Sequence, residues 1–139
     1  MIGLDTNVLV RYYMSADGDD ALTVAQSEAA RALIDSGKRL MVSKTVVLEL
    51  EWVLRGYYEL TKPQVVQAFT QLLSMAHIQV EDKIAVQSAL AAVAQGFDFA
   101  DALHHASYSA CSAVATFDDK GFARRAKKAH WKPPVTVLA

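Results

Sequence analysis

The sequence predicts an α/β fold: a three-layer α/β/α domain with a short, mainly parallel central sheet flanked by helices. Two observations support this prediction. Short apolar runs alternate along the chain with longer segments of helical periodicity. Strands this short, when helices separate them, pair in parallel with crossover helices on both faces of the sheet. Because 139 residues suffice for one buried core, we expect a single domain over residues 1–139.

Local signals place the individual elements. Apolar runs mark the expected strands, at residues 2–4, 40–42, 78–80, 113–117 and 135–138. Capping residues and glycines bound the expected helices, at residues 20–36, 44–58, 61–75, 82–96 and 98–110, with a short basic helix from about residue 119. Asp19 or Asp20 is the expected cap of the first of these helices. The strand at 113–117 is of the buried type, and the last strand follows Pro133 and Pro134 as an edge strand.

Composition excludes several classes of protein. The single cysteine, Cys111, excludes an intramolecular disulfide framework and a Cys-rich metal site, and its small neighbours predict a buried structural thiol. No apolar run is long enough to span a bilayer, and no secretory signal precedes Asp5, so we expect a cytoplasmic protein with no membrane partner. Charge is unevenly divided, with −7 over residues 1–119 and +6 over residues 120–139, which gives the net −1.

Two candidate acids follow strands. Asp5 ends the first strand and Asp118 ends the fourth, and ligands of parallel sheets bind at the carboxyl ends of strands. Asp5 can equally serve as the N-cap of the following helical turn. Of the neighbouring pair, Asp119 is the expected cap of the basic helix, and Asp118 is the acid expected to face a cleft.

Two glutamates on the helix at 44–58 are separated by helical geometry. Glu51 falls on the far side from the apolar arc and forms an i,i+4 pair with Arg55, so a surface position explains it fully. Glu49 falls at the margin of the apolar arc without a basic neighbour, and a half-buried carboxylate of this kind needs a metal or a hydrogen-bond network. We therefore expect Glu49, and not Glu51, to be functional.

The helix at 98–110 carries two further acids. Asp98 is fully explained as its N-cap, whereas Asp101 in the first turn is only partly explained by the helix dipole. Both are expected on the polar side of the helix, together with His104 and His105.

Acids grouped in this way favour metal-dependent phosphodiester hydrolysis. Clustered carboxylates repel one another unless divalent cations hold them ionised, and oxygen-only ligands suit Mg²⁺ or Mn²⁺. A haloacid-dehalogenase-like hydrolase is disfavoured because Asn7 stands where a second acid is needed. A zinc hydrolase is disfavoured because the adjacent His104 and His105 diverge on a helix. A protein-binding module whose acids serve only as caps remains the alternative from another class.

Four segments together resemble the PIN-domain ribonucleases, and the whole chain resembles a VapC-type toxin of a toxin–antitoxin pair. They are residues 4–9, 47–50, 98–103 and 116–118. The resemblance implies a PIN-like fold in which a quartet of acids binds metal and catalyses RNA cleavage, namely Asp5, Glu49, Asp101 and Asp118. It also implies polar residues that orient these acids, namely Thr6, Asn7 and Thr116. Asp98 and Asp119 are possible additional acids.

The same resemblance implies partners. They are an RNA substrate, a second copy of the chain in a homodimer, and a cognate antitoxin that covers the active site and alone contacts operator DNA. Cleavage of RNA would then arrest growth; a housekeeping PIN-like nuclease is the alternative. Because the acids repel the RNA backbone, we expect phosphate contacts from the basic segment, at Arg124, Arg125, Lys127 and Lys128. Trp131 beside it is interpreted as a packing residue.

Overall fold

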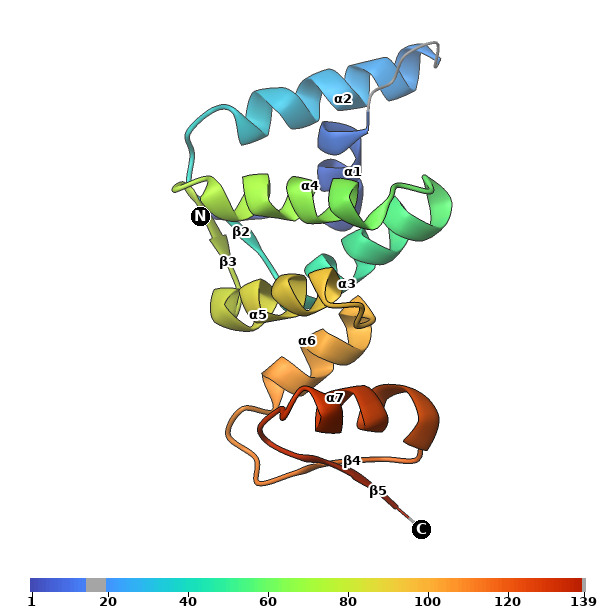
Figure 1. Cartoon of the computed structure of the whole chain (residues 1–139). Coiled ribbons are helices and arrows are strands. Elements are labelled where there is room, and N and C mark those ends of the chain that lie inside the picture. Colours follow the sequence, from blue (N-terminus) through green and yellow to red (C-terminus); the bar gives the residue numbers. More distant parts are fainter. Residues whose placement is uncertain (15–19, 139) are drawn as a thin grey trace. The chain divides into compact units, whose positions relative to one another are not determined.

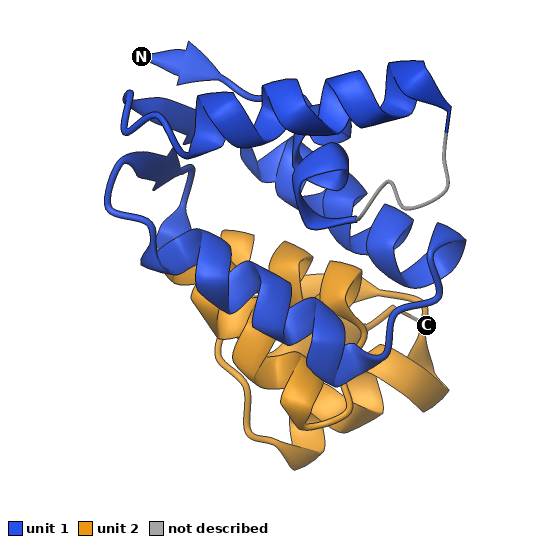
Figure 2. Cartoon of the chain, turned by 90° about the horizontal axis from the view of Figure 1, so that it is seen from above, with its two compact units in different colours: residues 1–83 blue, residues 84–139 orange. Residues whose placement is uncertain are grey.

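The computed structural model describes residues 1–14 and 20–138, which form two compact units. The first unit is Met1–Lys83 and the second is Ile84–Ala139, shown in separate colours in Figure 2. Each unit is described by itself below. The expectation of one domain over residues 1–139 stays a prediction.

The first unit is built on a three-stranded parallel sheet in the order β1-β2-β3 (Figure 1). Its strands are β1 (Ile2–Gly3), β2 (Leu40–Val42) and β3 (Ile78–Val80), and Leu40 pairs with both Ile2 and Ile78. Leu40 and Val42 are completely buried. The parallel pairing predicted from short strands is therefore confirmed for this sheet.

Helices of the first unit begin where the sequence places a capping side chain. They are α1 (Thr6–Tyr13), α2 (Ala21–Ile34), α3 (Lys44–Trp52), the π-helical segment η1 (Val53–Tyr57) and α4 (Lys62–Ser74). Asp20 caps α2, Ser43 caps α3, and Thr61 with Gln64 forms a capping box on α4. The alternative cap of α2, Asp19, lies outside the described residues.

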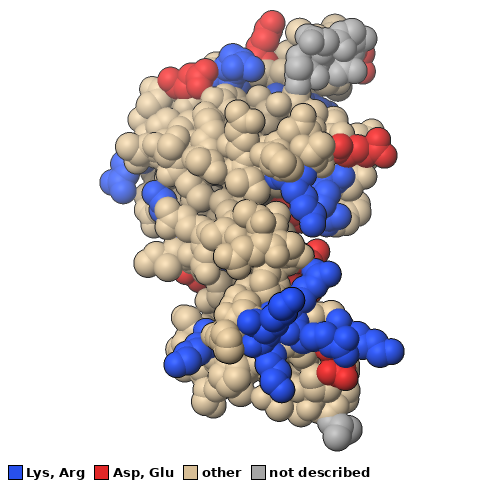
Figure 3. All heavy atoms as spheres, in the orientation of Figure 1, with Lys and Arg blue, Asp and Glu red and all other residues tan. Residues whose placement is uncertain are grey.

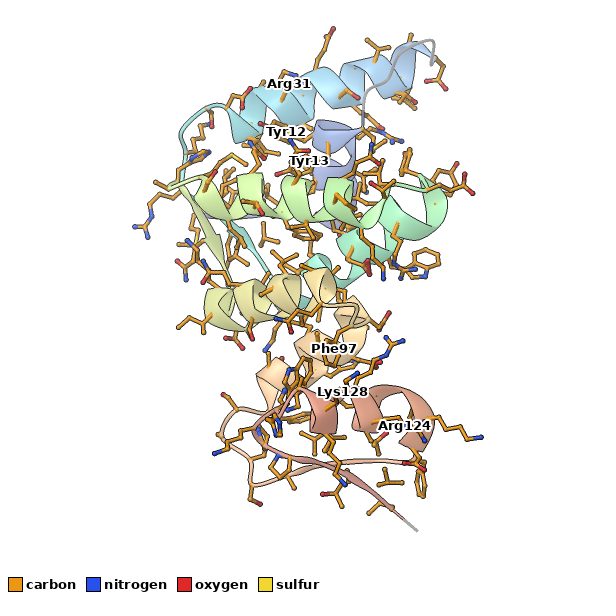
Figure 4. The ribbon with its side chains drawn as sticks, in the orientation of Figure 1. Tyr12, Tyr13, Arg31, Phe97, Arg124 and Lys128 are labelled. Atoms are coloured by element: carbon orange, nitrogen blue, oxygen red, sulfur yellow. The ribbon has the colours of Figure 1, made fainter. Side chains whose placement is uncertain are left out.

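Aromatic and polar contacts connect α1 to its neighbours. The guanidinium of Arg31 on α2 lies 5.5 Å from the centre of the Tyr12 ring, and the Tyr13 hydroxyl donates to Gln71 of α4 at 2.5 Å (Figure 4). Burial raises the pKa of Tyr13 above its ordinary range, so this hydroxyl stays a donor at neutral pH. These contacts hold in place the helix that begins directly after Asp5.

The second unit combines helices with a two-stranded parallel sheet. Its elements are α5 (Lys83–Ala94, whose first residue still belongs to the first unit), α6 (Phe99–Ser107), β4 (Val114–Thr116), η2 (Asp119–Ala123), α7 (Arg124–Lys128) and β5 (Val135–Val137). Trp131 stacks on Phe97 with ring centres 4.0 Å apart, and its ring centre lies 4.6 Å from that of His105. The interpretation of Trp131 as a packing residue agrees with these contacts.

The structure differs from the sequence predictions in four details. The strands form two separate sheets, β1-β2-β3 and β4-β5, instead of one central sheet. β4 is not buried, because its residues are intermediate or exposed, and α6 ends at Ser107, before the expected residue 110. Cys111 is exposed, since it lies beyond the end of α6 in an irregular connection. The mixture of helices and short parallel sheets is nevertheless consistent with the expected PIN-like α/β/α fold.

No helix within the described residues is both long and apolar enough to cross a membrane.

Candidate active site

Asp5 stands at the junction between β1 and α1. Its backbone is extended, and its Oδ1 atom accepts a hydrogen bond from the backbone amide of Thr6 at 2.8 Å. The carboxylate remains exposed. Asp5 is therefore a helix cap and a solvent-accessible acid at once, so the two interpretations of this residue do not exclude each other.

The burial of Glu49 and Glu51 is the opposite of what the sequence predicts. Glu51 is 4% exposed, and it accepts a hydrogen bond from Arg55 Nε at 2.8 Å, whereas Glu49 is exposed. The i,i+4 pair is confirmed, but the predicted burial is wrong. The buried stripe of α3 is centred on Val47 and Leu50, which rotates it by roughly 60° from the arc predicted from apolar residues and brings Glu51 inside it.

Asp5 and Glu49 nevertheless line one pocket of about 390 Å³ in the first unit. Within the described parts of the chain, Glu49 has no hydrogen-bond or ion-pair partner. Thr6 and Asn7 also line this pocket. We call it the acid pocket, and define it by these four residues together with Val10, Arg11, Val53, Tyr57 and Tyr58.

The hydroxyl of Thr6 is an unsatisfied polar atom at the acid pocket. The residue is 6% exposed, and its Oγ1 atom has no hydrogen-bond partner among residues 1–14 and 20–138. Leaving a buried hydroxyl unpaired costs roughly 1–3 kcal/mol, so a water or an ion bound to this atom would stabilise the structure. The orienting role expected of Thr6 is performed instead by its backbone amide, which donates to Asp5.

In the second unit, Asp98 and Asp101 lie at the start of α6. Asp98 caps this helix by accepting the backbone amide of Asp101 at 3.1 Å, as predicted. Partial burial, followed by the charges of Asp98 and Asp118, raises the pKa of Asp101, while His104 and Arg125 oppose the shift. The acids of this unit therefore influence one another electrostatically.

His105 does not lie on the polar side of α6. It is 7% exposed, and its Nε2 atom is 2.8 Å from the carbonyl oxygen of Pro133. The prediction that it faces outward with His104 is wrong, because the stacked rings of Phe97 and Trp131 enclose this part of α6.

Asp118, and not Asp119, caps the helical segment that follows β4. Its two oxygens accept the backbone amides of Gly121 at 2.9 Å and Phe122 at 3.0 Å, which lower its pKa. The assignment of the cap to Asp119 is therefore wrong: Asp119 is the first residue of η2 and is exposed. The hydroxyl of Thr116 accepts the backbone amide of Asp118 at 3.1 Å.

The basic segment is exposed along α7. Figure 3 shows Lys and Arg side chains gathered over this part of the second unit, and Figure 4 labels Arg124 and Lys128 on it. Arg125 differs from the others because its Nη1 atom donates to the carbonyl oxygen of Gly96 at 2.6 Å. Its charge also opposes the rise in the pKa of Asp101 and adds to the effect of the two backbone amides that lower the pKa of Asp118. Arg125 is thus a partner of the acids, whereas Arg124, Lys127 and Lys128 are exposed cations.

The acid pocket fits Mg²⁺ or Mn²⁺ through its donor chemistry. Across residues 1–14 and 20–138 no three His, Cys, Asp or Glu side chains are grouped closely enough to enclose an ion. Mg²⁺ does not require such a cage, because it commonly binds through one or two carboxylates and completes its shell with waters and substrate phosphates. Asp5 and Glu49 provide that pair of carboxylates, and the unpaired hydroxyl of Thr6 lies at the same pocket.

Sequence analysis missed three residues of the acid pocket, namely Arg11, Tyr57 and Tyr58. Tyr57 is 74% exposed. A spacing of four residues could have identified Arg11, which lies one turn after Asn7, whereas no regular spacing could have identified Tyr57, because a π-helical turn separates it from Glu49.

A comparison with known protein families matches almost the whole chain to a single family. Residues 2–128 match the PIN domain. This range includes all four acids of the predicted quartet and the four basic residues. No curated protein and no solved structure matches the chain.

Proposed function

The chain belongs to the PIN domain family, whose members are generally nucleases, and from this premise we propose that it is a Mg²⁺- or Mn²⁺-dependent endoribonuclease. One observation supports this most directly. The exposed carboxylates of Asp5 and Glu49 line one pocket with a buried hydroxyl that has no partner among the described residues. Such a pocket is suited to a cation that brings its own waters and a phosphate.

The division of roles follows from the surroundings of each acid. When bound, the divalent cation lowers the pKa of a water molecule and neutralises charge that develops on the phosphate. Asp5 and Glu49 would hold it through their carboxylates. Asp101 and Asp118 would supply further negative charge, with Asp118 kept ionised by two backbone amides. Thr116 would fix the backbone of Asp118.

The exposed cations Arg124, Lys127 and Lys128 would offset the repulsion between these acids and the RNA backbone. A charge-reversed variant carrying Arg124→Glu and Lys128→Glu should bind RNA more weakly and with a shallower salt dependence, as measured by fluorescence anisotropy in chelator. Unchanged affinity and salt dependence would reduce α7 to a solvated helix without a role in binding.

Cleavage of a structured RNA by the purified protein tests the proposal. Activity should require Mg²⁺ or Mn²⁺ and disappear in chelator. Asp5→Asn and Asp101→Asn should each lower the rate by at least about 100-fold while circular dichroism stays native. Glu28→Gln, at an exposed glutamate on α2, is the matched control and should cleave normally. Metal-independent cleavage, or full activity of Asp5→Asn, would contradict the proposal.

We further propose that the chain is the toxin of a VapC-type pair, with a homodimeric form and a cognate antitoxin that mediates contact with operator DNA. The support is the resemblance of its four acidic segments to that group. Expression of the chain alone should arrest growth, Asp5→Asn should not, and a small neighbouring reading frame should restore growth. RNA cleavage without arrest would indicate a housekeeping nuclease, and neither effect would indicate a protein-binding module.

A further inference from the structure

We infer that the acid pocket receives a single unpaired nucleotide, whose base stacks on the ring of Tyr57 and whose phosphate is bound by Arg11. This inference rests on the proposed function, because it concerns the substrate of the same pocket. It assigns two residues of this chain, Tyr57 and Arg11, to contacts with one nucleotide of that RNA. Tyr57 and Arg11 are then positioning residues that contact substrate.

The π-helical segment brings Tyr57 to the acid pocket. The backbone amide of Tyr58 donates to the carbonyl oxygen of Val53 at 3.1 Å, five residues back instead of the four of an α-helix. This extra residue in the turn rotates the following side chains by roughly 100° relative to a continued α-helix. Tyr57 therefore leaves the buried stripe that continues through Leu54, and π-helical turns of this kind are frequent at functional sites.

The ring of Tyr57 has the exposure and the support that a stacking surface needs. It is 74% exposed, and it lines the acid pocket together with Asp5 and Glu49. Tyr58 contacts it edge-on, with ring centres 4.9 Å apart and planes at 77°. This contact restrains the Tyr57 ring yet leaves most of its surface open, so that stacking of a base costs little conformational entropy.

Arg11 provides the positive charge that the acid pocket otherwise lacks. Its Nε atom donates to Gln26 Oε1 at 3.1 Å, which fixes the plane of the guanidinium. A planar guanidinium binds phosphate oxygens through paired N–H donors, and it does so more specifically than an ammonium group. The acid pocket thus combines an aromatic surface for a base, a cation for a phosphate and two carboxylates.

The size of the acid pocket favours one nucleotide. Its volume of about 390 Å³ lies near the lower end of the range for small-molecule sites. A base within a duplex is stacked and paired, so it must be single-stranded or extruded before it can lie on a tyrosine ring. Stacking accepts any base, because every base has a π-face. The pocket therefore accepts an unpaired nucleotide with any base.

Binding of short RNAs without cleavage tests the inference. The probe is a fluorescein-labelled single-stranded oligoadenylate of about ten nucleotides, used in chelator with the full chain. Tyr57→Ala should weaken binding about 5- to 100-fold, the range measured for loss of one base–aromatic stack. Tyr57→Phe should bind within about twofold of the unmodified chain, and Tyr57→Leu should resemble Tyr57→Ala. Tyr108→Ala is the matched control, since Tyr108 is an exposed tyrosine that does not line the acid pocket.

A spectroscopic probe separates stacking from a structural effect. An RNA of the same length with one 2-aminopurine should lose fluorescence on binding the unmodified chain or Tyr57→Phe, and keep it with Tyr57→Ala at saturating protein. Arg11→Gln should weaken binding but preserve the quenching. Equal binding of a fully paired RNA duplex, no detectable binding of the single strand, or quenching by Tyr57→Ala would each overturn the inference.

The two proposals fail in different ways. If the chain binds single-stranded RNA through Tyr57 but never cleaves it, the proposed nuclease function is wrong and the nucleotide site stands. If metal-dependent cleavage requires Asp5 but Tyr57→Ala binds and cleaves like the unmodified chain, the nuclease function stands and the inference is wrong.

Discussion

The acids of the two units are held in different ways. In the first unit Asp5 accepts one backbone amide, and Glu49 has no partner among the described residues. In the second unit Asp118 accepts two backbone amides, and Asp101 is partly buried and coupled to the charges of Asp98 and Asp118. The first pair is therefore exposed to solvent and makes few contacts with the fold, whereas Asp118 is stabilised by the fold itself.

The two units therefore show two different environments for a carboxylate that could bind a ligand. An acid that the backbone already satisfies is rigid and ionised before any ligand arrives. An acid left open to solvent can move to complete a coordination shell, but the fold does not depend on it. Substitutions in the first pair should consequently affect activity without affecting stability, and substitutions around Asp118 should affect both.

The largest effect is expected at Glu49. Glu49→Gln should lower RNA cleavage at least about 100-fold and leave the free energy of unfolding within about 0.5 kcal/mol of the unmodified chain. Glu51→Gln, on the same helix, should instead destabilise the protein by about 1–2 kcal/mol, because it weakens a charged pair whose Arg55 side chain is 43% exposed. Cleavage kinetics measure the rate, and urea unfolding measures the free energy of unfolding. The two variants should be compared at a temperature where both are folded. If they lose activity equally there, the assignment of Glu49 to activity and of Glu51 to stability is wrong.

An intermediate effect is expected at Gly121. A Cβ atom there would lie 2.7 Å from Asp118 Oδ2 and 3.0 Å from Oδ1, so alanine must displace the carboxylate. Gly121→Ala should lower cleavage by about 10- to 100-fold, as expected when the orientation of a ligand is lost. Gly3→Ala is the control near Asp5, since a Cβ atom at Gly3 meets nothing within 4 Å. A fully active Gly121→Ala would show that the position of Asp118 is not critical.

The smallest effect concerns the stability of the fold at acidic pH. Because its pKa is lowered in the folded state, ionised Asp118 stabilises the fold above the ordinary aspartate value of 3.8, and this contribution is lost as pH falls below it. Asp118→Asn should therefore melt slightly below the unmodified chain at pH 7, and the difference should shrink as the pH falls through the lowered pKa of Asp118 in the folded state, which lies below 3.8. Thermal melts across pH in metal-free buffer measure this. A difference that does not shrink at any acidic pH where both proteins stay folded would assign the effect to hydrogen-bond geometry and not to charge.

Elements with local signals could be predicted from the sequence, and those set by packing could not. The caps Asp20 and Asp98 were identified because a capping side chain and the amide it accepts lie within three residues. Parallel pairing followed from the alternation of short strands with helices.

The predictions were wrong where tertiary structure decides which face of a helix is buried or at which residue a helix begins. The buried stripe of α3 includes Glu51 because Val47, and not Val46, faces the interior. Tyr57 is exposed because a π-helical turn interrupts the α-helical period, and periodicity calculated at one angle per residue cannot contain such a turn. The choice between Asp118 and Asp119 as the cap depended on which of two adjacent residues is the first of η2.

The exposure of Cys111 has a chemical consequence for any study of assembly. A solvent-accessible thiol can oxidise to an intermolecular disulfide, and a chain with one cysteine then yields a covalent pair that no symmetric interface has produced. Sedimentation in reductant and with Cys111→Ser separates this oxidation product from an association between folded surfaces. The same thiol offers a single attachment point for a fluorophore or spin label in the second unit, with no substitution needed elsewhere.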